Sequence, residues 1–241
     1  MAIQRRELVY DGPGGPFEGV LAFDPDAGEA RPGVLIVPNV LGQKEADNLV
    51  AERLAALGYV GLAADVFGQG KRTTRESPDP ARYMNQLNAD RPLLRDRLHA
   101  SLAALKAQPE VDPARTAAIG YCFGGKCVLD LARSGADLRA VVSFHGIFDR
   151  PSYANVTPIA PRILVCHGWA DPLAPPESAA ALTAELTEGG ARWQLHAYGH
   201  AGHGFTDRSM QGSTRPGFGY DADADASSWA AMQRLLAEAL A

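Results

Sequence analysis

Segments with the patterns of strands and of helices alternate along most of the chain, and this alternation restricts the possible folds more than any other feature. Residues 33–37, GVLIV, form a continuous apolar run, as expected of a strand covered on both faces. Residues 45–57 follow with helical spacing and precede Gly58, a residue type that often terminates helices. Such alternation predicts an α/β fold, with a mostly parallel central sheet and helices on both faces.

The same alternation continues to the end of the chain, with no linker that would divide it. Further strands are expected at residues 59–64, 116–119, 139–144, 162–165 and 192–197, and helices at 81–87, 93–107, 125–133, 177–188 and 226–240. Two alternating runs at residues 6–10 and 17–23 flank the turn-forming DGPGGP and predict an N-terminal antiparallel hairpin at a sheet edge. We expect a single domain over residues 1–241.

Charge and hydropathy argue against several classes of partner. The chain has 241 residues and a formal net charge of -5, and it lacks the clustered basic face that binds nucleic acid. No apolar stretch is long enough to cross a bilayer, and the opening MAIQRRELVYDG lacks the apolar run of a secretory signal. We therefore expect no nucleic-acid or membrane partner and a cytoplasmic protein.

The three cysteines, Cys122, Cys127 and Cys166, do not form the pattern of a disulfide framework or of a metal site. Their number is odd and low, and none belongs to a CxxC pair, so neither disulfides nor a zinc site is expected. Cys127 and Cys166 are expected to be buried, inert, small apolar residues. Cys122 differs because of the segment that contains it.

Residues 120–125, GYCFGG, follow an expected strand and open an expected helix. So tight a turn forces its central residue, Cys122, into a strained conformation and raises the side chain at the carboxyl edge of the sheet. Gly120 and Gly124 flank it because a side chain there would collide with the reversed backbone. The helix start favours a thiolate, and the N–H of Phe123 is a candidate oxyanion donor. The spacing is that of a nucleophile elbow with cysteine as the nucleophile.

A catalytic thiolate needs a base, and the base needs a carboxylate to orient it. In this fold the chain order is nucleophile, acid, histidine. Asp171 lies just past the strand expected at residues 162–165, where an acid can reach the histidine. His203 lies between glycines that free the backbone to turn the ring toward the cleft, so we favour it over His200, which we place in the loop. The predicted catalytic triad is Cys122, Asp171 and His203.

Four segments carry a resemblance to a known family: ADVFGQG at 64–70, GYCFGG at 120–125, HGWADP at 167–172 and HAGHGF at 200–205. Over nearly its whole length the chain resembles the dienelactone hydrolases, or carboxymethylenebutenolidases. The resemblance implies an α/β-hydrolase fold, no cofactor, and a Cys–His–Asp triad at the positions already predicted. It also implies an oxyanion hole formed by the N–H groups of Phe123 and Val40. The implied activity is hydrolysis of an ester or lactone through a covalent thioester.

The chain departs from the family pattern at two places. Family members have a glutamate in the loop after the first parallel strand, where it helps to form thiolate when substrate arrives. Asn39 stands at that position here, and an amide cannot accept a proton. Four residues past the base, where the family has an arginine for the substrate carboxylate, this chain has Asp207 with Arg208 beside it, and Arg82 is a candidate for a second such arginine. An anionic substrate therefore does not follow from the sequence.

Four residues are expected near the substrate: Asn39, Phe67, Arg82 and Trp169. For the aromatic residues, packing in the core is an equal alternative. His145, at the end of an expected strand, either lines the site or is a satisfied buried imidazole. Specificity is expected to lie in the polar excursion at residues 67–91 and in the loops after Phe144 and Phe205, because loops at the carboxyl ends of strands build such sites.

Two other functions compete with hydrolysis. GYCFGGKC nearly matches the phosphate-binding pattern GxxxxGK, but Cys127 is a poor ligand for magnesium and Lys126 is expected at a helix surface. A non-catalytic ligand-binding protein of the same fold is favoured by Asn39 and opposed by the intact triad. We expect a small-molecule ester or lactone as the partner, and a monomer or homodimer.

Overall fold

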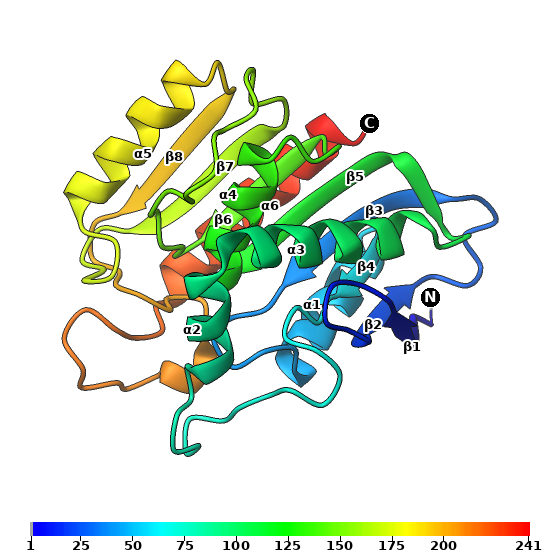
Figure 1. Ribbon diagram of the computed structural model, residues 1–241, viewed down its shortest axis with the longest axis horizontal. Coiled ribbons are helices and arrows are strands. Elements are labelled where there is room, and N and C mark those ends of the chain that lie inside the picture. The colour runs from blue at the N-terminus through cyan, green and yellow to red at the C-terminus, as the bar shows by residue number, and fades with distance from the viewer. Residues whose placement is uncertain (1) are drawn as a thin grey trace.

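The central element is an eight-stranded mixed sheet, seen in a computed structural model that describes residues 2–241 (Figure 1). The strand order is β1-β2-β4-β3-β5-β6-β7-β8. The strands are β1 (Gln4–Tyr10), β2 (Phe17–Phe23), β3 (Arg31–Val37), β4 (Val60–Ala63), β5 (Val111–Tyr121), β6 (Ala140–Phe144), β7 (Arg162–Gly168) and β8 (Trp193–Tyr198). Strands β3 to β8 are parallel, and β1 and β2 pair antiparallel at one edge. The predicted fold and N-terminal hairpin are confirmed.

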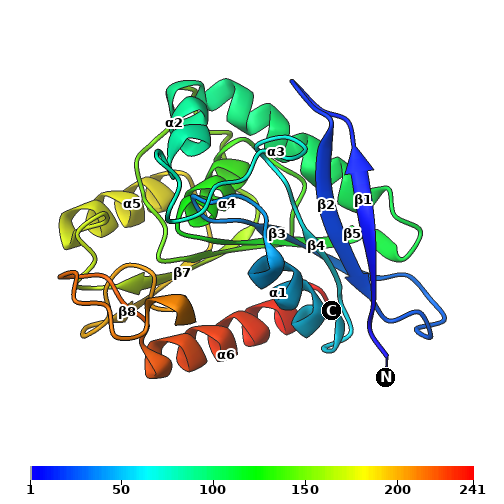
Figure 2. The ribbon, with the colours of Figure 1, turned by 90° about the horizontal axis from the view of Figure 1, so that it is seen from below.

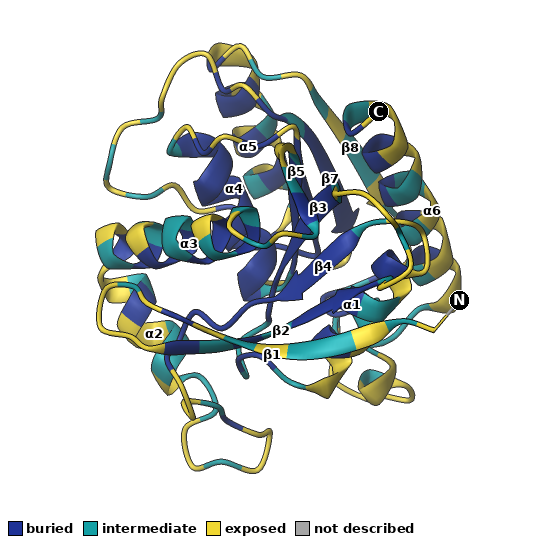
Figure 3. Cartoon of the chain, turned by 90° about the vertical axis from the view of Figure 1, so that its right-hand side faces the viewer, coloured by how far each residue is buried: buried dark blue, intermediate teal, exposed yellow. Residues whose placement is uncertain are grey.

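Helices cover both faces of the sheet, as predicted (Figure 2). They are α1 (Glu45–Ala55), α2 (Arg82–Ala89), α3 (Arg91–Lys106), α4 (Phe123–Arg133), α5 (Pro176–Glu188) and α6 (Ala222–Ala239), with a short 3₁₀ helix, η1 (Arg208–Met210). One core cluster joins α2, α3, α4 and α5 to the sheet, and a second joins α1 and α6 to its other face. As a result, the central strands are buried, and the exposed residues lie on the outer surfaces of the helices and in the loops (Figure 3).

Local sequence explains where several elements begin and end. The Asp90 side chain accepts a hydrogen bond from the Leu93 N–H and caps α3, with Pro92 in the first turn. Gly58 adopts a left-handed φ of 91° just after α1, the conformation expected of a helix-terminating glycine. Strand β5 is longer than expected because its start, at Val111, pairs with β3 before the register shifts.

The topology gathers the ends of the central strands at one edge of the sheet. Cys122 directly follows β5, and His145 directly follows the neighbouring β6. Asp171 lies three residues past β7, and His203 lies five residues past β8. Parallel strands place all of these positions at the carboxyl edge, where open α/β sheets build their sites. Among residues 2–241, no helix is both long enough and apolar enough to cross a membrane.

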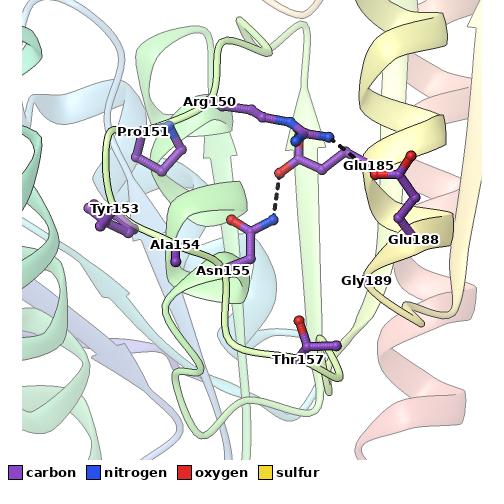
Figure 4. Close-up of a pocket in the computed structure, with 9 residues that line it drawn as sticks. All are labelled: Arg150, Pro151, Tyr153, Ala154, Asn155, Thr157, Glu185, Glu188 and Gly189. Carbon is purple, nitrogen blue, oxygen red and sulfur yellow. Dashed lines mark hydrogen bonds and ion pairs between the residues drawn. The ribbon is translucent and has the colours of Figure 1, made fainter.

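A cluster of buried charges joins α3, α4 and α5 on one face of the sheet. Arg133 donates two hydrogen bonds of 2.9 Å to the Glu185 carboxylate and one of 3.1 Å to Asp130. Arg91, from the start of α3, lies 2.6 Å from the same Asp130. Arg150 approaches Glu185 to 3.0 Å from the β6–β7 loop, at the wall of a recess of about 390 Å³ (Figure 4). This recess contains none of the predicted catalytic residues.

Candidate active site

The turn between β5 and α4 has the geometry expected of a nucleophile elbow. Cys122 has φ 56° and ψ −113°, a left-handed conformation that is strained for a residue with a side chain. A Cβ on Gly120 would lie 2.0 Å from the Gly124 carbonyl oxygen, and a Cβ on Gly124 would lie 2.1 Å from the Val37 carbonyl oxygen. Both glycines are therefore required by close backbone contacts, as the sequence predicted.

The structure brings Cys122, His203 and Asp171 into contact. The half-buried Cys122 side chain lies beside the His203 ring and contributes to raising its pKa. His203 Nδ1 lies 2.8 Å from Asp171 Oδ2, and both residues are buried. The other Asp171 oxygen accepts the Leu173 N–H at 2.8 Å, which fixes the carboxylate in its loop. These contacts form a continuous path from the sulfur through the imidazole to the carboxylate.

The two contacts of the His203 ring change its acidity. Burial lowers the pKa of His203, but the hydrogen bonds with Asp171 and Cys122 raise it more, to about 10. The ring therefore keeps its proton at neutral pH and places a positive charge beside the sulfur of Cys122.

The glycines around His203 have a different role from the predicted one. A Cβ on Gly202 would lie 2.1 Å from the Gly217 carbonyl oxygen, and Gly204 has a left-handed φ of 75°. The His203 N–H donates to the Gly217 carbonyl at 2.7 Å, and the His203 carbonyl accepts from the Gly219 N–H at 3.1 Å. The glycines thus admit a second segment that clamps the backbone of His203. The prediction that they free the ring to turn was wrong.

The two histidines of the HAGHGF segment occupy different environments. The His200 side chain is 64% exposed, and its Nε2 lies 3.4 Å from Asp221 Oδ2. His203 is buried and contacts both Cys122 and Asp171. The geometry therefore favours His203 as the base, in agreement with the sequence argument.

The two predicted oxyanion donors belong to adjoining segments. Phe123 is the first residue of α4, so its N–H has no acceptor within the helix. Val40 lies in the turn that follows β3. The tight fit of Gly124 against the carbonyl groups of Val37 and Pro38 shows that the end of β3 and the start of α4 touch. The Phe123 N–H, at the start of α4, and the turn that contains Val40 therefore belong to neighbouring segments.

Asn39, at the position of the family glutamate, is held by its own loop. Its Oδ1 accepts a hydrogen bond of 3.0 Å from the Leu41 N–H and one of 3.1 Å from Lys44 Nζ. The side-chain oxygen is thus engaged by the loop and by a cation. A carboxylate at this position would meet the same lysine.

The other three candidates for substrate contact lie in contrasting surroundings. The Phe67 ring is buried, with centroids 5.9 Å from Phe123 and 5.7 Å from Tyr83, so it packs in the core. The Arg82 guanidinium lies over the Tyr83 ring, 4.3 Å from its centroid. Trp169 is 43% exposed at the end of β7, two residues before Asp171. Of the three, Trp169 presents the largest exposed apolar surface beside the site.

Asp207, which stands where the family has an arginine, forms an ion pair with the excursion that precedes α2. Arg75 Nη2 lies 2.7 Å from Asp207 Oδ2. This contact joins the excursion to the loop that carries His203. Each charge neutralises the other, so this position offers no free cation to a substrate carboxylate.

Lys126 is buried, and its predicted surface position was wrong. Its ammonium lies 2.8 Å from Asp149 Oδ2 and 2.9 Å from Asn88 Oδ1. The cause is that α2 and the β6–β7 loop cover the first turn of α4. A lysine held in this way is not free to bind a phosphate, and Cys127 beside it is buried as predicted. Both observations count against the nucleotide-binding alternative.

Two contacts of the His203 ring were not predicted from the sequence. The His145 and Phe218 rings meet it edge to face, at centroid distances of 5.3 and 5.5 Å. His145 Nε2 also lies 2.8 Å from Thr206 Oγ1. The place of His145 after an expected strand was a usable signal, whereas no sequence pattern marks Phe218 or Thr206. Among residues 2–241, no group of three or more His, Cys, Asp or Glu side chains is arranged to hold a metal ion.

A mostly parallel sheet with these connections, and with a tight strand-to-helix turn after β5 whose central residue has a positive φ, is the α/β-hydrolase fold. Within that class, the model of the dienelactone hydrolase family matches residues 17–240. The chain belongs to this family and is a hydrolase of the dienelactone hydrolase type.

Two solved structures resemble the protein over their whole lengths. One, m3DLH, is 38% identical, with a TM-score of 0.94 and complete coverage of both chains. The dienelactone hydrolase-like promiscuous phosphotriesterase P91, from metagenomic libraries, is 36% identical with a TM-score of 0.91, again over 100% of both chains. An uncharacterized protein of Caenorhabditis elegans is 38% identical over 158 residues, which are 61% of this chain and 95% of that protein.

Proposed function

We propose that the protein hydrolyses an ester or lactone through a thioester formed on Cys122, with His203 as the base and Asp171 as its orienting group. The observation that carries the proposal is the path of contacts from the sulfur to the imidazole and on to the buried carboxylate. The path begins at Cys122, which the tight turn holds in a left-handed conformation. In this fold the nucleophile is presented to substrate at that position.

The first half of the proposed reaction forms the acyl-enzyme. The pair starts as the Cys122 thiolate beside the protonated His203 ring, and the thiolate attacks the carbonyl carbon of the substrate. The N–H groups of Phe123 and Val40 donate to the oxyanion. The carbon–oxygen bond then breaks, the leaving alkoxide takes the proton from His203, and a thioester remains on Cys122. With a lactone, the alkoxide stays attached to the acyl group.

The second half releases the acid. His203 takes a proton from a water molecule, and the hydroxide attacks the thioester carbonyl. The carbon–sulfur bond breaks, and the departing thiolate again lies beside His203, which now holds the proton taken from water. Throughout, Asp171 holds the Nδ1 side of the ring and stabilises its positive charge, as the carboxylate does in other catalytic triads.

The charges around the site support uncharged esters and lactones as substrates. Asp207 is paired with Arg75, and the Arg82 guanidinium is stacked on Tyr83. The position of Asp207 therefore offers no free cation, whereas Arg82 keeps its positive charge over the Tyr83 ring. Because one of the two arginines inferred from the family is replaced by an acidic residue, we propose that binding does not require a carboxylate on the substrate.

A second substrate class is supported by the similarity to P91, which is a promiscuous phosphotriesterase. A thiolate that attacks carbonyl carbon can also attack the phosphorus of a neutral triester and displace an aryloxide. Water would then hydrolyse the phosphorylated Cys122. We propose this as a secondary activity, to be tested with aryl dialkyl phosphates beside the esters.

The test is a kinetic comparison over a panel of aryl esters, aliphatic esters and lactones. Wild-type protein should turn over part of the panel, and Cys122→Ala and His203→Ala should each lower kcat by about 10³-fold or more. His200→Ala is the matched control, because this exposed histidine contacts neither sulfur nor Asp171, and it should retain activity.

Full activity of Cys122→Ala would refute the proposed nucleophile. Equal losses in the two histidine variants would refute the choice of base. Binding of esters without any turnover would support the non-catalytic alternative, and thermal stabilisation by a nucleotide would revive the phosphate-binding alternative.

A further inference from the structure

His145 occupies an unusual position directly after β6. It is buried and has φ 37°, a left-handed conformation that is strained for a residue with a side chain. Its Nε2 shares a hydrogen bond of 2.8 Å with Thr206 Oγ1. Its Nδ1 is buried and has no partner within residues 2–241, so the contact with Thr206 is the polar anchor of this ring.

That hydrogen bond connects the loop of the base to the strand beside the nucleophile. Thr206 lies three residues after His203 in the same loop. On the other side, β6 pairs with β5, and the Cys122 N–H donates to the Phe144 carbonyl at 3.0 Å. His145 therefore joins, through one side chain, the backbone that positions the sulfur and the loop that positions the imidazole.

The ring of His145 also contacts the base directly. Its centroid lies 5.3 Å from that of His203, at an interplanar angle of 67°, and 5.1 Å from that of Phe205, at 83°. Burial, together with the charge of His203, holds the pKa of His145 well below the usual range for histidine. A neutral ring can support the imidazolium of His203 without repelling it.

We propose that His145 is a positioning residue for the hydrolysis, which holds the His203 ring between Asp171 and Cys122 through its contact with Thr206. This inference rests on the proposed function of Cys122. It extends that function because no substrate atom needs to touch His145. The left-handed backbone of His145 fits such a role, since strain of this kind persists where surrounding contacts fix a functional geometry.

The two partners of the hydrogen bond can be altered separately. Thr206→Val removes the hydroxyl at nearly constant volume, and Thr206→Ser keeps it. His145→Asn suits the left-handed backbone, since asparagine tolerates this region, but its side chain is too short to reach Thr206. Thr183→Val is a control for the loss of a threonine hydroxyl, since Thr183 is half-buried and its hydroxyl bonds only within α5.

The expected result is a loss of kcat of roughly 10- to 100-fold in Thr206→Val and in His145→Asn, with KM changed by less than about threefold. The double variant should lose no more than the worse single variant, because both remove the same contact. Thr206→Ser should recover most of the activity that Thr206→Val loses, and Thr183→Val should match the wild type. Melting temperatures measured in parallel show whether each variant is folded at the temperature of the assay.

Three outcomes would overturn the inference, and they are distinguishable from one another. If wild-type hydrolysis depends on Cys122 while Thr206→Val and His145→Asn retain kcat, His145 has no positioning role and the proposed function stands. If Thr206→Ser is as impaired as Thr206→Val, the residue acts through packing and not through its hydroxyl. If the wild type shows no hydrolysis that depends on Cys122, the proposed function fails and the inference fails with it.

Discussion

At the scale of single residues, the proposed hydrolysis depends on the environment of His203. The ring is buried, which alone would favour its neutral form, yet its two hydrogen-bond partners reverse that effect. Asp171 is the more strongly held partner, because the Leu173 N–H and the His203 ring engage its two oxygens. The charge state of the base is therefore set by a contact that can be removed with one substitution.

Asp171→Asn should lower the pKa of His203 from about 10 toward the ordinary 6.5, because the amide has no charge to stabilise the imidazolium. Proton NMR titration of the ring would measure the change. A raised folded-state pKa stabilises the fold below about pH 6.5, and this contribution is lost as the pH rises through about 10. The unfolding free energy of the wild type should therefore fall over that range, and that of Asp171→Asn should fall less. An unchanged titration in the variant would contradict the assignment.

Residue-level predictions from the sequence succeeded where the pattern was local. The spacing of GYCFGG required the glycines at 120 and 124, and close backbone contacts at both positions confirm them. The surface position of Lys126 was wrong, because its burial depends on α2 and on the β6–β7 loop, which are distant in sequence. The contact between His145 and Thr206 spans 61 positions and has no sequence signal.

At the scale of elements, the start of α4 and the end of β3 fit together through their backbones. Gly124 leaves room for the Val37 carbonyl, and this contact brings the turn after β3 to the elbow. The order of the strands and helices was predictable from hydropathy, and the bounds shifted by a few residues where pairing extended a strand, as in β5. Pairing partners cannot be read from one segment alone.

Gly124→Ala should force α4 away from β3, because the new Cβ would lie 2.1 Å from the Val37 carbonyl oxygen. We expect a loss of about 1–3 kcal/mol in the unfolding free energy and a large loss of activity, since the elbow is displaced. Gly199→Ala is the control, because a Cβ there meets nothing within 4 Å. Chemical denaturation and ester hydrolysis would be measured for both. Wild-type stability and activity in Gly124→Ala would contradict the described packing.

At the scale of the whole molecule, charges buried away from the active site connect three helices. Arg133, Asp130 and Arg91 link α3 to α4, and Glu185 extends the cluster to α5 and to the recess of Figure 4. This cluster could not be predicted from the sequence. The pairs of Arg91 with Asp130 and of Arg133 with Glu185 join segments that are distant in sequence, and the local pair of Arg133 with Asp130 is meaningful only together with them. The single domain over residues 1–241 stays a prediction.

Glu185→Ala should lower the unfolding free energy by about 3–5 kcal/mol, because it leaves Arg133 buried without its main partner. Burial raises the pKa of Glu185, but hydrogen bonds from Arg133 lower it more, to a net value below 4.5. The stabilisation is therefore present above about pH 4.5 and is lost as the pH falls. Glu188→Ala, at a side chain 76% exposed, is the control and should change stability by less than about 0.5 kcal/mol. Equal melting temperatures for the two variants would contradict this role.

The central claim is that Cys122 forms a covalent acyl-enzyme, and mass spectrometry tests it most directly. Wild-type protein and Cys122→Ala would be exposed briefly to an activated aryl ester, quenched in acid and digested. We expect a mass increase of one acyl group on the wild-type peptide that contains Cys122, and no increase on the corresponding peptide of the variant. Turnover by the wild type with the acyl group on another residue, or equal acylation of Cys122→Ala, would contradict it.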